Sequence, residues 1–454
     1  MSGTGNIGTL SLIARMSQLE REKFVGNPQI TFFKSVYRRH TNFSRFLSSE
    51  TYQDNGGNAF GNPVSYTLST TIGDLLSKVY LQHKIKEMSI DDSGNARTIY
   101  ANLGTNLIKN DDDSLSITIG TNTIFQNNGL YLEAKQELLN DMCVSASGNY
   151  SVSPNLSEVA ASNITTDTGS NASLITCNNG SHNNYTTFSG GVSGVELPAV
   201  AKSYETEYFY LIPDFSFGYD YGLALPLCCM RSEEVTLNID YNSPDKVMDI
   251  SNPHLESTCI TEYIHLDVEE KKRFIMNDHN YIIETVKQKD CAASENSTVL
   301  SGFTGLTKYI LMVGNGNSDP TLSTSVSQST PTKIEGDDIT MNLTIDGNNL
   351  NAGNYNKNIF TRLNLYEYFP GCGRELFDGG TPDKNYGHLD SIGVFPIALE
   401  PLNMTQPSGC ISNKGSGIGS LILDLGTNTN KLKIYTVDYN ILIISNGTCQ
   451  KALY

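Results

Sequence analysis

Short strand-like segments recur in the same order in the two halves of this 454-residue chain. Residues 77–81 (SKVYL) match residues 307–311 (TKYIL) at an offset of 230 residues. Residues 117–119 (ITI) then match residues 343–345 (LTI) at an offset of 226, and a glycine turn follows each. Such short matches arise by chance in β-proteins, but their preserved order favours an internal duplication. The sequence therefore predicts two related units in tandem.

A third matched pair locates an insertion in the first half. Residues 237–239 (LNI) align with residues 423–425 (LDL) at an offset of only 186. Because the offset falls from 226 to 186, the first half must carry 40 extra residues. Residues 145–194 supply them, since this run is rich in Ser, Asn, Thr and Gly and cannot build a core. We expect a long surface loop there, with a shorter analogue at 315–332.

The pattern of apolar residues is typical of an all-β chain. Short β-branched runs alternate with turn residues, Trp is absent and helical periodicity is scarce. The expected strands are 64–70, 78–86, 115–125, 208–212, 234–241, 281–287, 307–313, 339–345, 393–399, 420–425 and 431–445, the last broken in two near 437–440.

Composition limits the function. The net charge of -17 argues against a protein whose main surface binds nucleic acid, because phosphates require clustered Lys and Arg. The nine cysteines are odd in number and form no C-x-x-C pair, so neither a disulfide framework nor a zinc module is indicated. No secretory signal and no membrane-spanning apolar run is evident. We expect a soluble protein with free thiols in a reducing cytoplasm.

No catalytic, cofactor or metal site is predicted. Acidic neighbours occur at 111–113, 269–270 and 337–338, but no His or nucleophile accompanies them, and adjacent acids in loops are mostly solvated. The seven histidines show no helical i, i+4 or alternating-strand spacing. The glycine-rich runs 371–373 and 415–419 fit turns. Cys228–Cys229 fits a buried apolar position better than a nucleophile.

The most distinctive local segment is 26–43, which combines a turn with aromatic and basic side chains. Asn27–Pro28 initiates a turn, and the apolar residues from 30 to 37 alternate in part, which favours the first strand of a sandwich. Taken alone, its aromatics fit an ordinary core and its basic residues a solvated edge. Residues 10–24 before it fit an amphipathic arm or a flexible terminus equally well.

Residues 26–43 closely resemble the opening of the major capsid proteins of nucleocytoplasmic large double-stranded DNA viruses. Further resembling stretches follow in the family's order at 222–227, 262–274, 395–409 and 439–447. The residues that carry the structural motif are Asn27, Pro28, Phe32, Phe33, Pro226, Gln406, Pro407 and Gly409.

The resemblance implies an all-β fold of two tandem eight-stranded antiparallel jelly rolls. It suggests an arm at 1–25, a first jelly roll at 26–265 with the insertion 145–194, a linker at 266–280 that is solvated or forms a single helical turn, and a second jelly roll at 281–454. Three chains would form a pseudo-hexameric trimer, because two similar domains per chain give a three-fold assembly six similar sides.

The resemblance also implies partners. They are neighbouring capsomers, minor capsid proteins and the internal membrane surface, with no direct nucleic acid, in a virion capsid assembled in the host cytoplasm. The expected assembly contacts are Lys34, Tyr37, Arg38, Arg39, His40 and Phe43. Compared with the family, the arm is more charged, and the insertion replaces an aromatic-containing stretch; we expect this insertion to face outward.

Two other functions remain open on the sequence. One is a minor or penton-like capsid paralogue, which copy number per particle would distinguish. The other is a carbohydrate-binding or hydrolysing β-sandwich, which glycan binding would reveal.

Overall fold

The computed structural model describes residues 17–18, 22–23, 26–35, 37–69, 71–86, 88–89, 97–99, 107–139, 143–144, 150–151, 164–166, 195–197, 203–206, 209–230, 233–246, 253–291, 297–299, 305–314, 342–345, 348–349, 357–369, 392–412, 422–424 and 432–452. The chain divides into two units, Met1–Asn42 and Phe43–Tyr454. Most of 145–194 and all of 315–332, 337–338, 371–373 and 415–419 lie outside the described residues.

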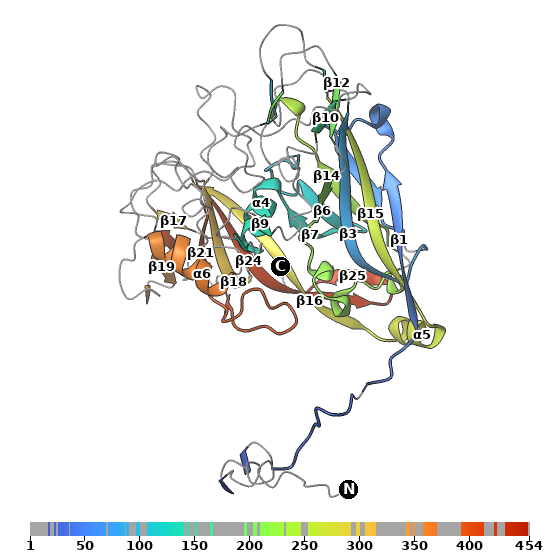
Figure 1. Ribbon diagram of the computed structural model, residues 1–454, viewed down its shortest axis with the longest axis vertical. Helices are drawn as coiled ribbons and strands as arrows, with labels where there is room; N and C mark the ends of the chain where they lie inside the picture. Colours follow the sequence, from blue (N-terminus) through green and yellow to red (C-terminus); the bar gives the residue numbers. More distant parts are fainter. Residues whose placement is uncertain are drawn as a thin grey trace, which may run out of the picture. The chain divides into compact units, whose positions relative to one another are not determined.

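The first half of the larger unit builds two four-stranded antiparallel sheets (Figure 1). One has the order β1-β15-β3-β13, made of β1 (Phe43–Thr51), β15 (His254–Leu266), β3 (Leu75–Lys86) and β13 (Phe209–Leu211). The other has the order β2-β14-β6-β7, made of β2 (Pro63–Thr67), β14 (Val235–Asp240), β6 (Leu115–Ile119) and β7 (Asn122–Asn127). Strands distant in sequence are thus neighbours in space, which is the topology of a jelly roll.

The second half repeats this strand order. One sheet runs β16-β24-β18-β21, made of β16 (His279–Cys291), β24 (Leu432–Ser445), β18 (Leu306–Gly314) and β21 (Ile392–Pro396). The other runs β17-β23-β19-β20, made of β17 (Ser297–Val299), β23 (Ile422–Asp424), β19 (Asn342–Ile345) and β20 (Asn348–Asn349). Two short strands, β22 (Ile411–Ser412) and β25 (Thr448–Lys451), extend the first of these sheets.

The sequence repeat maps onto equivalent strands. The first matched pair lies in β3 and β18, each third in its sheet. The second pair lies in β6 and β19, also third, and the third pair falls on β14 and β23, both second. The prediction of an all-β chain with two tandem eight-stranded jelly rolls is therefore confirmed.

Burial follows the strand pattern. β14 alternates buried and half-buried residues, as expected for a strand with one face on a core. β24 is instead buried at each of its first nine positions and runs without interruption between β16 and β18. The expected break near 437–440 was wrong, because the polar residues Asp438 and Asn440 there are themselves buried within the sheet. The single strand expected at 115–125 is likewise a hairpin, which turns at Gly120 with a φ of +59°.

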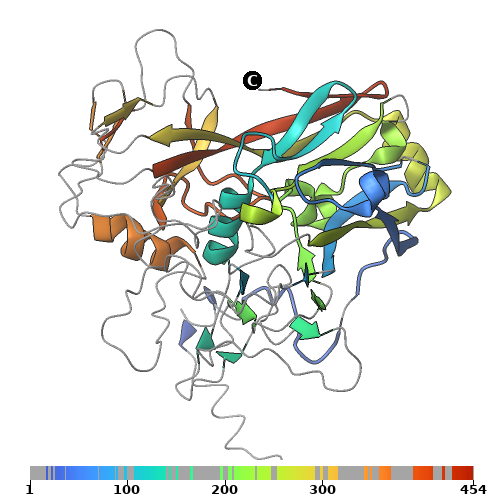
Figure 2. The same ribbon diagram turned by 90° about the horizontal axis from the view of Figure 1, so that it is seen from above.

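The structure contains more helix than the single helical turn that the sequence allowed for the linker. The helix α4 (Gly129–Leu139) follows β7, and Figure 2 shows it beside strands of both halves. The 266–280 segment contains α5 (Val268–Met276), which is longer than a single turn and is capped by Asp267. The segment η9 (Ile359–Leu363) continues into α6 (Asn364–Tyr368). Within the described residues, no helix has the length and apolar character needed to cross a membrane.

The chain also contains several short 3-10 turns and three small sheets. The 3-10 turns are η2 (Asp54–Gly57), η5 (Ser216–Gly218), η6 (Tyr221–Leu223), η7 (Leu227–Cys229) and η8 (Pro244–Lys246). The small sheets are β10-β12-β4, β11-β5 and β8-β9, formed by β4 (Met88–Ser89), β5 (Arg97–Ile99), β8 (Cys143–Val144), β9 (Tyr150–Ser151), β10 (Ile164–Thr166), β11 (Val195–Leu197) and β12 (Ser203–Thr206). Two pieces of the 145–194 insertion, β9 and β10, therefore pair with its flanks.

The strand expected from 30 to 37 is absent from the described part of that segment. Residues 26–35 form bends and a turn, and the first strand starts at Phe43. Asn27 has a φ of +50°, a left-handed conformation that Asn tolerates better than most residues. The alternation of apolar residues in this segment was misleading because no neighbouring strand pairs with it among the described residues.

Candidate functional site

The expected assembly contacts are exposed. Lys34 and residues 37–40 all lie on the surface of the smaller unit, where Tyr37 is 87% exposed. Phe32 and Phe33, expected to belong to the structural motif, are 90% and 99% exposed. Phe43 opens β1 and is also exposed, opposite Leu266 of β15. A run of uncovered aromatic side chains interleaved with cations is typical of a surface that contacts a partner.

Charge is distributed unevenly between this segment and the rest of the chain. Residues 1–42 contain six Lys and Arg but only two Asp and Glu, a net charge of +4. Since the whole chain carries -17, residues 43–454 carry -21. The smaller unit is therefore expected to attract a partner surface that carries net negative charge.

The other motif residues have separate structural roles. Pro226 is buried and precedes η7, next to Leu225, whose backbone pairs with Leu76 of β3 in both directions at 2.9 Å. Gln406, Pro407 and Gly409 lie in the loop after β21. The backbone of Glu400 closes this loop through two hydrogen bonds with the Ser408 hydroxyl, at 2.8 and 3.2 Å. Within the larger unit, Pro226 and the loop residues thus belong to different structural elements.

Several polar contacts between the two jelly rolls involve α4 and the residue that precedes it. Asn128 caps this helix, because its Oδ1 accepts the backbone N–H of Tyr131 at 2.8 Å. The same oxygen accepts the Tyr435 hydroxyl of β24 at 3.0 Å, and the Asn128 amide donates to Gln288 of β16. One buried side chain therefore both starts a helix of the first half and holds two strands of the second.

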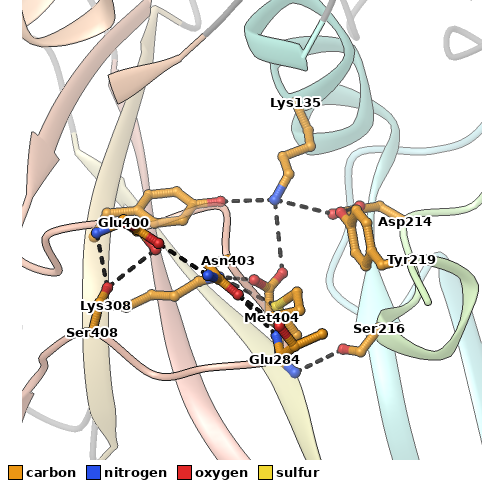
Figure 3. A network of polar contacts seen from close by, with 12 residues as sticks. Lys135, Asp214, Ser216, Tyr219, Glu284, Lys308, Glu400, Asn403, Met404 and Ser408 are labelled. Atoms are coloured by element: carbon orange, nitrogen blue, oxygen red, sulfur yellow. Dashed lines mark hydrogen bonds and ion pairs between the residues drawn. The ribbon is translucent and has the colours of Figure 1, made fainter. Parts of the chain in front are cut away.

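About two turns beyond Asn128, Lys135 of α4 connects the halves through charge (Figure 3). Its Nζ lies 3.6 Å from Asp214 of the first half and 3.7 Å from Glu284 of β16, and it donates to the Tyr309 hydroxyl at 2.9 Å. Burial opposes a charge here, but Asp214 and the tyrosine hydroxyls outweigh it and hold the pKa of Lys135 well above its ordinary value. Lys135 is therefore a fixed cation between the two jelly rolls.

A second lysine lies beyond Glu284. Lys308 of β18 is fully buried, its Nζ forms an ion pair with Glu284, and it donates to the Met404 sulfur at 3.5 Å. A carboxyl partner alone favours the charged amine, yet burial and the nearby Lys135 cation outweigh it and lower the pKa of Lys308 to about 6. The two lysines in this network therefore have opposite protonation tendencies.

This network was not predictable from the sequence. Glu284 and Lys308 fall within two expected strands, where charged residues usually face solvent, and Lys135 falls in a helix that was not expected. Their partners lie far away in the chain. Only the predicted duplication hinted that a contact between two related halves had to exist.

The first half holds a further buried polar chain in its own core. His83 of β3 is fully buried, and its Nε2 lies 2.8 Å from the Tyr241 hydroxyl, which lies 2.7 Å from the Ser257 hydroxyl. Burial lowers the pKa of His83 to about 3. Because the unfolded chain binds the proton near pH 6.5 and the folded chain does not, acid must weaken the fold.

We expect this effect to be measurable between pH 6.5 and pH 5, where most carboxylates stay ionised. In that range His83 lowers the free energy of unfolding by up to about 1.4 kcal/mol for each pH unit of acidification. His83→Phe removes that contribution, so the variant should show a flatter profile in denaturant unfolding at stepped pH. Identical slopes in the two proteins would contradict the assignment.

Catalytic chemistry has no basis in the described residues. They contain no group of three or more His, Cys, Asp or Glu side chains placed to hold a metal ion. Glu269 and Glu270 occupy the first turn of α5, where acidic side chains favour the helix dipole. Cys228 is buried as expected, and its hydrogen bond to Cys229 together with burial raises the pKa of its thiol, which makes it a poor nucleophile.

The repeated strand order places the molecule in the class of double jelly-roll proteins. Residues 31–282 match the family described as major capsid protein N-terminus, which is more than half of the chain. The chain belongs to this major capsid protein family. The family is structural rather than enzymatic, and the protein is a capsid component of the virion of a large DNA virus.

Individual relatives agree with this assignment. A major capsid protein of Pyramimonas orientalis virus is 26% identical over 437 residues, which cover 93% of each chain. The major capsid protein of Paramecium bursaria Chlorella virus 1 is 25% identical over 473 residues, covering 93% of this chain and 94% of the relative. Among solved structures, a quasi-atomic model of the PBCV-1 virus capsid matches with a TM-score of 0.61 at 20% identity, covering 93% and 99% of the two chains.

Proposed function

We propose that this capsid protein forms homotrimers that act as pseudo-hexameric capsomers and tile an icosahedral shell. The observation that carries the proposal is the repeated strand order of the two jelly rolls. A three-fold assembly of such chains presents six similar domains at its perimeter, so each capsomer can contact six neighbours with related surfaces.

Light scattering coupled to size-exclusion chromatography tests the trimer. The expected result is a particle of three times the 49.7 kDa chain mass. A particle with the mass of a single chain at assembly concentrations contradicts the proposal. Particle counting by quantitative mass spectrometry then separates a major from a minor or penton-like protein by its copy number.

The domain limits form part of the same proposal. We place the arm at 1–25, the first jelly roll at 26–265, the linker at 266–280 and the second jelly roll at 281–454. The described strands support the linker and the second jelly roll, because those of the first half end at Leu266 and those of the second begin at His279, whereas the first described strand of the first half begins only at Phe43. Shell assembly would then take place in the host cytoplasm.

We propose that the basic and aromatic segment from Lys34 to Phe43 joins capsomers to minor capsid proteins or to the internal membrane surface. Its support is the exposure of Tyr37 and the basic side chains around it, together with the net charge of +4 on residues 1–42. Both partners would be recognised by apolar contact plus attraction to negative charge.

Reversing two of these charges separates shell assembly from trimer formation. The variant Arg38→Glu/Arg39→Glu should leave the trimer intact and sharply reduce the yield of closed particles seen by electron microscopy. The matched control is Lys246→Glu/Lys272→Glu, which reverses two exposed charges on the larger unit. Normal particles from the Arg38/Arg39 variant contradict this role.

A further inference from the structure

An amine and a carboxyl group from two strands of the second jelly roll are buried together where that jelly roll meets Lys135 and Ser216 of the first half. Glu284 on β16 is 8% exposed and Lys308 on β18 is fully buried, and Lys308 Nζ contacts Glu284 Oε1 (Figure 3). The two strands flank β24, where Glu284 is opposite Tyr439. The pair therefore bridges the first and third strands of a sheet across the second.

The backbone holds Lys308 firmly in place. The pairing of β18 with β24 is irregular between Thr307 and Tyr309, so Lys308 occupies a bulge. Its carbonyl accepts two backbone N–H groups, from Ile397 at 3.0 Å and Ala398 at 2.9 Å. Such double anchoring limits the positions its amine can reach and keeps it against Glu284.

The surroundings of the amine favour its neutral form. Nζ lies 5.4 Å from the centre of the Tyr309 ring and 5.4 Å from that of Tyr439, contacts that by themselves favour the cation, and Met404 offers only a weak sulfur acceptor. Burial and the Lys135 cation lower the pKa of this amine to about 6. At neutral pH Lys308 therefore carries the free electron pair that a nucleophile needs.

The surroundings of the carboxyl group favour attack on it. Lys135 Nζ lies 3.7 Å from Glu284 Oε2, on the side away from Lys308, and Asp214 fixes this cation at 3.6 Å. The backbone N–H of Glu284 donates to the Ser216 hydroxyl at 2.7 Å, which locks the residue itself. Lys135 can stabilise negative charge that develops on Oε2 when the carboxyl carbon becomes tetrahedral.

We propose that Glu284 and Lys308 condense into an intramolecular isopeptide bond after folding. Lys308 Nζ attacks Glu284 Cδ to form the C–N bond, and the C–Oε1 bond breaks. Oε1 leaves as water, carrying the carboxyl proton and one proton from Nζ, while Oε2 becomes the amide oxygen facing Lys135. The step consumes one amine and one carboxylic acid, releases one water and needs no oxidant or cofactor.

Enclosure explains why the step runs forward. An amine and an acid held in contact react at an effective concentration far above that of free solutes, and a dry interior removes the water that reverses the reaction. The product also replaces a buried amine and a buried carboxyl group by one uncharged amide, which leaves fewer polar groups in the dry interior. Lys135 remains paired with Asp214.

Intact-mass spectrometry of the denatured full-length protein tests the bond. The expected mass is lower than the sequence mass by one water molecule. Trypsin should release residues 274–287 joined to residues 290–333, because it does not cleave after an acylated Lys308. An unmodified intact mass, together with a free peptide that ends at Lys308, overturns the proposal.

Controls lie within the same protein. Lys86 and Glu256 approach to 2.5 Å and Lys433 and Asp290 to 3.7 Å, but each pair has at least one solvated side chain. Both should remain unlinked, and a water loss mapped to either pair overturns the assignment. Lys308→Met should restore the full mass expected for that variant. Lys135→Met, which removes a positioning residue, should lower the linked fraction measured at a fixed time after purification; an unchanged fraction removes Lys135 from the proposal.

Discussion

Replacing Lys135 by Met is expected to lower the free energy of unfolding by about 3 to 5 kcal/mol, the largest effect of any single change considered. Lys135 is the shared cation of Asp214 and Glu284; Lys135 and Glu284 are buried, and the Asp214 side chain is only 10% exposed. Met fills a similar volume but leaves Asp214 without its counter-charge. A buried, uncompensated carboxylate costs more than the net strength of the ion pair itself.

The measurement is guanidinium unfolding of parent and variant in the same oligomeric state. Because the chain has no Trp, circular dichroism or tyrosine fluorescence has to report the transition. The matched control is Lys272→Met, which breaks a pair with Glu269 at 3.4 Å whose side chains are both more than half exposed. Such surface pairs contribute about 0 to 1 kcal/mol. Equal losses from the two variants would show that Lys135 is not a buried cation.

A second expected result concerns Asn128, whose replacement by Ala should cost about 2 to 4 kcal/mol. The loss has two parts. The helix α4 loses its N-cap, and the Tyr435 hydroxyl and the Gln288 side chain lose a partner inside the molecule. Because the second part acts across the two jelly rolls, the variant should also unfold them in two separate transitions.

A second helix cap serves as a control that separates the loss of capping from the loss of the contacts that Asn128 makes between the two jelly rolls. Asp267 caps α5 by accepting the backbone N–H of Val268 at 2.8 Å and is exposed. Asp267→Ala should cost about 1 kcal/mol, the usual value for a lost cap, with a single transition. Differential scanning calorimetry of both variants measures the number of unfolding transitions and their midpoints. A single transition for Asn128→Ala, shifted no more than that of Asp267→Ala, would leave Asn128 with a capping role alone.

The fold was largely predictable because it depends on local patterns. Val235 to Asp240 alternates in burial, and the corresponding apolar spacing is visible in the sequence. The internal repeat was detectable for the same reason, because strands at equivalent positions of the two jelly rolls need similar apolar spacing. The helix α4 escaped notice because its described side chains are nearly all buried, so no polar face sets off an apolar stripe in the sequence.

The candidate site was less predictable because its contacts are long-range. Lys135 and Glu284 are separated by most of the first half and show no local signature. Phe32 and Phe33 were mispredicted although the pattern around them is local. Their apolar character suggested a packed strand, yet both side chains are exposed in the single chain. A sequence pattern shows that a side chain prefers to be covered, but it does not show by what.

The pairing of β1 with β15 has a consequence for synthesis on the ribosome. Thr51 of β1 pairs with Thr258 of β15, which is 207 residues later in the chain, so β1 cannot pair until β15 has been synthesised. Even then α4 remains unfinished, because Glu284 and Tyr435 come from segments that have not yet been translated. Until β24 emerges from the ribosome, β16 and β18 lack the strand that lies between them, and Lys135 remains in contact with water. This late completion favours binding by chaperones and makes translation of β24 the event that commits the polypeptide to its final form.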